Sequence, residues 1–239
     1  HLITRRDGER LNTVQAFVRP FTLPGIALQD FRQRMEDSNF TLPAGYRLQF
    51  GGEAEGSGEA RGNLMSVFLP LIILMIGTLV LAFNSFRDAG IIVMVAILSI
   101  GGALLTLWMF NYPLGFMAVV GNMGLIGLAI NDSIVVLSAL RADRKACEGD
   151  VAAALHVIMD GSRHIISTTL TTIGGFIPLI IWGGLFWPPL AMAIAGGMIG
   201  ATMLALFFVP PMFVLTVRLK LRRERKKAAR RARLAPTAA

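Results

Sequence analysis

Five long apolar stretches, separated by short polar segments, occupy most of the chain after residue 63. Each holds at least 20 residues, which is enough for a helix to cross the ~30 Å hydrocarbon core of a bilayer. The pattern therefore predicts a mainly α membrane protein with five transmembrane helices. Their expected ranges are 64–83, 89–110, 116–140, 165–187 and 190–217.

The first 63 residues follow a different pattern. Residues 13–18 alternate between polar and apolar side chains, and residues 46–50 do so after Pro43-Ala44-Gly45, so both favour strands. Residues 28–35 place Leu28, Phe31 and Met35 on one helical face. A strand–helix–strand unit of this size is too small to stand alone, and we expect it to complete a larger sheet. This α+β segment, residues 1–55, is the first predicted domain.

Basic residues in the connecting segments predict the topology. The segment 141–164 is rich in Lys and Arg, and the turn 84–88 carries Arg87. These segments and the C-terminus share one side if the helices alternate, and the positive-inside rule makes that side cytoplasmic. The opposite boundary carries the aromatic residues Trp108, Tyr112, Trp182 and Trp187, as an interfacial belt should. The N-terminal segment is then expected outside the cytoplasm.

The net charge of +8 is concentrated in the C-terminal tail. Residues 218–233 contain ten Lys and Arg against the single acid Glu224, so this segment carries +9 and the rest of the chain −1. A basic run directly after a membrane helix is typical of an anchor on anionic lipid. We therefore expect membrane lipids, and no nucleic acid, as partners of a cytoplasmic tail over 219–239.

A short helix is predicted near 150–160, within the domain 56–218 that holds the membrane helices. Asp150 is a suitable N-cap, Val151, Leu155 and Ile158 line one face, and Gly161 is expected to end the helix. Such a helix would lie along the membrane surface or simply connect two membrane helices, and the sequence leaves both alternatives open.

Asp132 is the only charged residue within the five apolar stretches. A carboxyl group at this depth costs several kcal/mol unless it is paired, protonated or hydrated, so an ionisable residue there indicates a functional site. Asp132 is a candidate for binding and releasing a proton in each conformational cycle. The alternative is a neutral acid that only hydrogen-bonds a neighbouring helix.

Small and polar residues accompany this acid in the third stretch. Gly124, Gly127 and Asn131 share one helical face by spacings of three and four. Small residues let a neighbouring helix approach closely. Asn131 and Asp132 project about 100° apart, since a helix has 3.6 residues per turn. One partner helix can therefore meet both side chains.

The fourth stretch opens with five hydroxyl residues in six positions, 167–172. Thr168, Thr171 or Thr172, and Gly175 fall on one face. Hydroxyl groups relay protons or hold water beside a carboxylate, and they also bond the backbone of their own helix. Both interpretations remain open, and depth in the membrane does not choose among the three threonines.

The remaining motifs indicate packing and no chemistry. Gly196 and Gly200 form a GxxxG pattern in the fifth stretch, which favours close helix contact. Cys147 is the only cysteine, and the histidines form no metal-binding pattern. No nucleophile–base pair, phosphate loop or dinucleotide fingerprint appears. We therefore expect a protein that is not an enzyme and has no metal or cofactor.

Three segments together resemble the C-terminal part of a resistance-nodulation-division (RND) efflux permease of the hydrophobe and amphiphile exporting type. They are GLIGLAINDSIVVL at 124–137, the run from Arg163 to Leu179, and the run from Gly196 to Pro210. The resemblance covers nearly the whole chain. It implies that residues 1–55 end a periplasmic porter subdomain and that the five helices are the last five of twelve.

The resemblance implies a homotrimeric proton-driven pump in the inner membrane of Gram-negative bacteria, exporting drugs or other amphiphiles. A periplasmic adaptor and an outer-membrane channel would be its partners. In such drug exporters two aspartates on an earlier helix pair with a lysine, assisted by a threonine. The threonine matches Thr168, but the lysine position matches Asn131 and the next residue matches Asp132. The lysine-based charge switch therefore does not carry over.

The resemblance also implies that the remaining N-terminal part of the permease lies on another segment, since repeat-built transporters form their sites between repeats. We expect this chain to be a fragment that does not transport alone. Two alternatives remain: a non-transporting membrane assembly element, and an RND relative that moves metals or lipids.

Overall fold

The structure is a computed structural model that describes residues 5–6, 9–19, 22–38, 40–43, 45–50, 53–184 and 186–234. The chain separates into two compact units, residues 1–56 and 57–239. The elements in chain order are β1 (Arg5–Arg6), β2 (Glu9–Arg10), α1 (Pro24–Asp37), α2 (Glu53–Phe83), α3 (Phe86–Met109), α4 (Phe116–Ala142), α5 (Arg144–Cys147), α6 (Val151–Trp182), α7 (Pro188–Phe207) and α8 (Val209–Leu234).

The first unit contains the predicted helix, but the predicted strand–helix–strand arrangement is wrong. Helix α1 begins at Pro24, whose missing N–H costs nothing in a first turn, and it includes all of 28–35. Residues 13–18 and 46–50 form no strand. The only ladder among the described residues is the two-residue antiparallel pair β1–β2. An alternating segment becomes a strand only when its backbone pairs with another strand, and none of the described segments pairs with these two.

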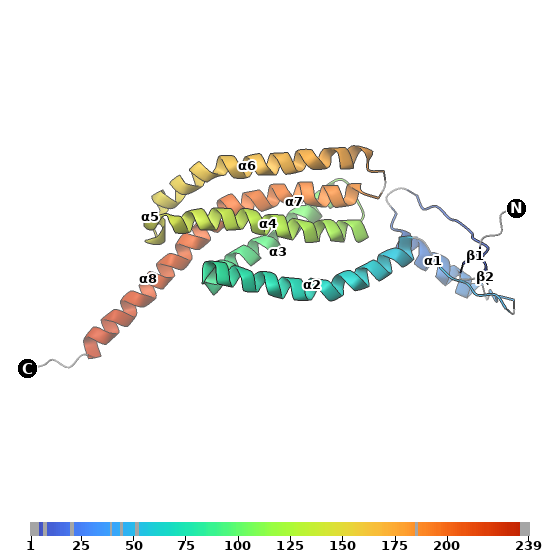
Figure 1. Cartoon of the computed structure of the whole chain (residues 1–239), viewed down its shortest axis with the longest axis horizontal. Helices are drawn as coiled ribbons and strands as arrows, with labels where there is room; N and C mark the ends of the chain where they lie inside the picture. Colours follow the sequence, from blue (N-terminus) through green and yellow to red (C-terminus); the bar gives the residue numbers. More distant parts are fainter. Residues whose placement is uncertain are drawn as a thin grey trace, which may run out of the picture. The chain divides into compact units, whose positions relative to one another are not determined.

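The second unit is a helical bundle, and it agrees with the apolar pattern. Among the described residues, five helical segments are long and apolar enough to cross a membrane. The short connections between them require neighbouring helices to run in opposite directions. Helix α7 packs against α3, α4 and α6 and therefore forms the centre of the bundle (Figure 1). Among the described side chains of α2, only Leu79 and Phe83, near its C-terminal end, are buried.

Two boundaries differ from the sequence prediction. Gly161 does not end a helix, because α6 runs without interruption from Val151 through Trp182. Asp150 is its N-cap, as expected, and accepts a hydrogen bond from the N–H of Ala152 at 2.9 Å. The fifth stretch is divided at Phe208 into α7 and α8. Pro210 and Pro211 follow this break and lack the N–H groups that a continuous helix would need.

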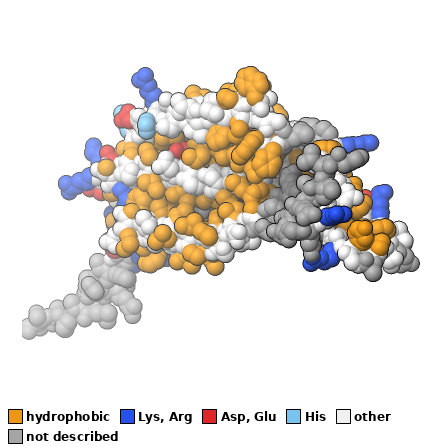
Figure 2. Space-filling model, turned by 45° about the vertical axis from the view of Figure 1, so that its right-hand side comes forward, with side chains coloured by type: hydrophobic (Ala, Val, Ile, Leu, Met, Phe, Trp, Pro, Cys, Tyr) orange, Lys and Arg blue, Asp and Glu red, His pale blue; other side chains and the backbone are white. Residues whose placement is uncertain are grey.

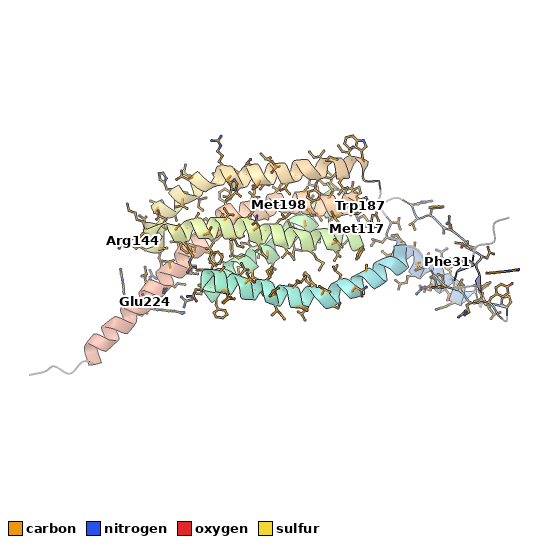
Figure 3. The ribbon with its side chains drawn as sticks, in the orientation of Figure 1. Phe31, Met117, Arg144, Trp187, Met198 and Glu224 are labelled. Atoms are coloured by element: carbon orange, nitrogen blue, oxygen red, sulfur yellow. The ribbon has the colours of Figure 1, made fainter. Side chains whose placement is uncertain are left out.

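The surface of the bundle matches a lipid environment. Apolar side chains cover much of the visible face, while Lys, Arg and His gather at the end with α5 and the start of α6 (Figure 2). Arg144 lies at that end, and Trp187 and Met117 lie at the opposite end (Figure 3). Trp108 and Trp182 are largely exposed. The bundle thus has one basic and one aromatic end, as the connecting segments predicted.

Candidate functional site

Asp132 lies inside the bundle, past the middle of α4, and only 5% of the residue is exposed. Its Oδ2 atom is buried and has no hydrogen-bond partner among the described residues. A buried carboxyl oxygen without a partner is costly, more so when the group is ionised. The bundle therefore accommodates this side chain only with incomplete hydrogen bonding, which is unusual for a purely structural residue.

Two threonines from two other helices complete the buried polar site. Thr202 on α7 is a polar neighbour of the Asp132 carboxyl group. The hydroxyl of Thr202 lies 2.6 Å from that of Thr169 on α6, and both residues are buried. The hydroxyl of Thr169 also donates to the Ile165 carbonyl at 2.9 Å. A hydroxyl–hydroxyl bond thus connects α6 and α7 in the apolar interior, beside the buried carboxyl group of α4.

His164 is the ionisable group that interacts electrostatically with Asp132. It is an exposed residue on α6, one position before Ile165. Helix α7 contains no ionisable residue. On α3 the acid Asp88 pairs with Arg141, so neither of these charges is directed at Asp132. The carboxyl group therefore has no strong ion-pair partner in the part of the chain that the structure describes.

Asn131, expected beside Asp132, points elsewhere. It is exposed on the outside of the bundle, whereas Asp132 and Ser133 are buried. Adjacent helical residues diverge by about 100°, and α7 covers only the side that holds Asp132. The structure therefore brings these two predicted site residues onto different surfaces of α4.

The three predicted threonines are not within the buried chain. Thr171 is exposed, and Thr168 and Thr172 are half-buried. Each of the three hydroxyls bonds a carbonyl of its own helix: Thr168 to Ile165 at 2.8 Å, Thr171 to Ser167 at 3.0 Å and to Thr168 at 2.9 Å, and Thr172 to Thr168 at 2.8 Å. Such local bonds are what threonines in an isolated helix make.

Thr169 and Thr202 were missed by the sequence reasoning. Thr169 lies within the hydroxyl cluster, but no sequence pattern distinguishes it from its neighbours. Thr202 did carry a signal, because it is the only residue of α7 with a polar side chain. An isolated hydroxyl in an otherwise apolar membrane helix indicates an interhelical hydrogen bond.

The glycines of α7 allow α3 to pack closely against this helix. A Cβ on Gly196 would overlap the Thr106 side chain of α3, and one on Gly200 would lie 3.4 Å from the Cα of Gly102. Among the glycines predicted for α4, Gly124 makes an ordinary contact with Ile194 and Gly127 faces open space. The close approach of α4 to α7 is instead at Gly121, where a Cβ would lie 2.7 Å from the Leu190 carbonyl oxygen.

A second polar cluster lies at the basic end of the bundle. Nε of Arg141 on α4 is 3.3 Å from a carboxyl oxygen of Asp88 on α3, and Asp88 is nearly buried. Nη1 of Arg141 also donates to the carbonyl of Phe83, the last residue of α2, and the guanidinium lies over the Phe83 ring. Arg141 thus joins the ends of α2, α3 and α4.

Comparison with known proteins identifies relatives along nearly the whole chain. A sequence profile described as the AcrB/AcrD/AcrF family matches residues 1–217. The chain is 30% identical over 224 residues to the cobalt-zinc-cadmium resistance protein CzcA of Cupriavidus metallidurans, covering 90% of this chain and 20% of that protein. It is 29% identical over 185 residues to the multidrug resistance protein MdtC of Salmonella enteritidis, covering 74% and 18%.

A solved structure shares the fold. A crystal structure of a heavy metal efflux pump matches with a TM-score of 0.64 and 24% identity, over 82% of this chain and 20% of that one. The chain spans about a fifth of the length of the curated relatives it matches. Within the described residues, no group of three or more His, Cys, Asp and Glu side chains has the arrangement of a metal site.

Proposed function

Because this chain belongs to the AcrB/AcrD/AcrF family of RND efflux transporters, we propose that it is part of a proton-driven efflux permease in the bacterial inner membrane. The buried carboxyl group of Asp132 is the observation that carries this proposal. An acid in the membrane interior that has no ion-pair partner among the described groups, and one unpaired oxygen, is suited to change its protonation state during a cycle.

The exposed faces of α4 and α6 support a second half of the coupling site. Asn131 and Thr171 lie on outer surfaces of the bundle, together with the half-buried Thr168 and Thr172. In a complete permease we propose that these side chains face the earlier membrane helices, on the remaining N-terminal part of the protein. Asn131 supplies a neutral amide there, so Asp132 is the group of this segment that carries a proton.

The proposed orientation places the first unit in the periplasm and α8 in the cytoplasm. The basic end of the bundle, with Arg141 and Arg144, supports a cytoplasmic position for that end. The exposed residues Lys220, Arg222 and Arg223 of α8 would then meet anionic lipid. A homotrimer, a periplasmic adaptor and an outer-membrane channel complete the proposed assembly.

Drugs or other amphiphiles are the first proposed cargo, and metal cations are the second. The name of one relative, MdtC, refers to multidrug resistance, and the name of another, CzcA, refers to resistance to cobalt, zinc and cadmium. Expressing the intact permease in a host that lacks its own efflux pumps distinguishes amphiphile export from metal export. Amphiphile export predicts a rise in the inhibitory concentrations of dyes and detergents, whereas metal export predicts tolerance of cobalt, zinc and cadmium only.

Asp132→Asn in the intact permease tests the proton-driven function. The amide keeps the shape of the carboxyl group but does not take up and release a proton during a cycle. Export should therefore be lost while folding and assembly persist. Ser133→Ala is a matched control, because the adjacent buried hydroxyl only bonds the Ala129 carbonyl of its own helix. Normal export by Asp132→Asn would contradict the proposal and favour a packing role in a membrane assembly.

A further inference from the structure

Thr202 differs from the other buried hydroxyl residues of the bundle. Among the described residues these are Ser99, Ser133, Thr169 and Thr202. The first three each donate to a carbonyl of their own helix, three or four residues earlier, which is the usual bond of a serine or threonine inside a helix. Within the described part of the chain, Thr202 makes no bond to a carbonyl of α7. Its hydroxyl instead lies 2.6 Å from the hydroxyl of Thr169 on α6.

The direction of this interhelical bond follows from the hydrogens available. A hydroxyl group has one hydrogen to donate. Thr169 donates its hydrogen to the Ile165 carbonyl at 2.9 Å. The hydroxyl of Thr202 is therefore the donor, and that of Thr169 is the acceptor. Because hydrogen bonds weaken steeply away from a straight geometry, this bond persists only while Thr169 faces α7.

Close backbone contacts fix α3 and α4 against α7, but they do not fix α6. A Cβ added to Gly102 of α3 would lie 3.5 Å from the backbone of α7, and one added to Gly121 of α4 would lie 2.7 Å from it. On α6 an added Cβ would meet no atom within 4 Å at any of its three glycines, Gly161, Gly174 and Gly175. Steric fit of the backbones therefore leaves the rotation of α6 open.

Apolar burial also holds α6 only weakly. Of its 32 residues, all of them described, only Ala154, Ile165 and Thr169 are buried, whereas twelve of the 20 residues of α7 are buried. Apolar contact is non-directional, so a small buried surface does not select one rotation of a helix. The bond between Thr169 and Thr202 is directional and does select one.

The rotation of α6 decides which of its side chains reach the outer surface of the bundle. With Thr169 directed at α7, Thr171 lies about 200° around the helix, at about 100° per residue, and it is exposed. A rotation by one residue would bring Thr168 to α7 and Leu170 to the direction that Thr171 now takes. Leu170 is an exposed apolar residue, so this rotation would replace a hydroxyl group by an apolar side chain on that surface.

We propose that Thr202 and Thr169 are positioning residues, whose bond fixes the rotation of α6 on α7 and thereby directs Thr168 and Thr171 toward the coupling surface. This inference rests on the proposed function, which places those two side chains opposite the earlier membrane helices. The polar side chain of α7 thus acts through α6.

A nitroxide spin label at Leu170 of the intact permease, in lipid and on a background without other reactive cysteines, measures this rotation. In the unmodified protein the label should face lipid and be relaxed by lipid-dissolved oxygen. Thr202→Val and Thr169→Val should raise the ratio of oxygen-shielded to oxygen-exposed labels by about 3- to 18-fold, the effect of a hydrogen bond between membrane helices. Thr202→Ser keeps the hydroxyl group and should restore the original ratio.

Thr216→Val is the matched control for the loss of a threonine hydroxyl. Thr216 is half-buried on α8, and its hydroxyl donates to the Phe213 carbonyl of its own helix at 2.7 Å. This variant should therefore leave the label at Leu170 exposed to oxygen and should export at the normal rate.

Export by the unlabelled variants separates positioning from a purely structural role. Thr202→Val and Thr169→Val should lower the maximal export rate in proportion to the shielded fraction, with recovery in Thr202→Ser. The KM for cargo should not change, because the bond orients the coupling surface and not the cargo site. An unchanged label ratio, or full export, in both valine variants would overturn the inference, even if Asp132→Asn is inactive and the proposed function stands. Normal export by Asp132→Asn would instead refute the proposed function, and the label would still show whether the bond fixes α6.

Discussion

Replacing Gly196 by alanine is expected to force α3 and α7 apart. A Cβ at this position would overlap the Cβ, Oγ1 and Cγ2 atoms of Thr106. The Thr106 side chain has little freedom to withdraw, because its hydroxyl donates to the Gly102 carbonyl at 2.9 Å and its Cβ is fixed to the α3 backbone. Adding a methyl group to a packed interior typically costs about 1–3 kcal/mol.

Two other glycines provide matched controls. Gly127→Ala adds the same methyl group to α4, where no atom lies within 4 Å, and Gly124→Ala meets only the end of Ile194 at 3.6 Å. Alanine is favoured over glycine in helix interiors by about 1 kcal/mol. This gain is common to both helices and cancels, so the free energy of unfolding should differ by about 1–3 kcal/mol between Gly196→Ala and Gly127→Ala.

Thermal unfolding of the purified chain in detergent, followed by near-ultraviolet circular dichroism, measures this difference. Gly196→Ala should unfold at lower temperature than the unmodified chain, while Gly127→Ala should match or exceed it. Equal melting temperatures for all three variants would show that α3 and α7 do not meet at Gly196, and the packing described for the centre of the bundle would be wrong.

Three further substitutions test the basic end of the bundle. Asp88→Asn leaves the exposed guanidinium of Arg141 without its charged partner and should lower the unfolding free energy by about 1 kcal/mol. An unchanged melting temperature would show that the pair is not formed. Gly149→Ala places a Cβ on a residue with φ +86° beside Arg218, at a cost of roughly 1–2 kcal/mol. The backbone amides of residues 143–150 should then exchange their hydrogens faster. Asp150→Ala removes the N-cap of α6, typically worth about 1 kcal/mol. The first turn of α6 should then fray and its amides exchange faster. Unaltered hydrogen exchange in Gly149→Ala or in Asp150→Ala would contradict the contact that the variant removes.

The membrane helices were predictable because a bilayer restricts the backbone to few solutions. A long apolar segment must satisfy its N–H and C=O groups internally, so hydropathy alone predicts helices there. No comparable constraint acts on the first unit. Residues 13–18 and 46–50 have the alternation of strands, but a strand also needs a neighbour that its own sequence does not encode. Gly161 failed as a stop signal because glycine is tolerated inside a helix that continues on both sides.

The site could be predicted only in part. The isolation of Asp132 is visible in the sequence, since one acid stands out against apolar residues. Which hydroxyl of α6 reaches Thr202 depends on how α6 is rotated against α7, and a rotation of one residue, about 100°, exchanges Thr168 for Thr169. That rotation is set by the packing of α6 against α7, which is a tertiary interaction. Thr202 follows from the same packing, although its solitary hydroxyl was a signal that the sequence already contained.

The uninterrupted course of α6 has a mechanical consequence. With 32 residues, α6 is ~48 Å long at 1.5 Å per residue, so ~18 Å extends beyond a hydrocarbon core of ~30 Å. Because the projecting turns continue the segment that holds Thr169, a tilt of about 10° would displace one end of this ~48 Å rod by ~8 Å relative to the other. A spin label at the exposed Met159 would therefore report reorientation of the buried part from outside the lipid, without altering the polar side chains within.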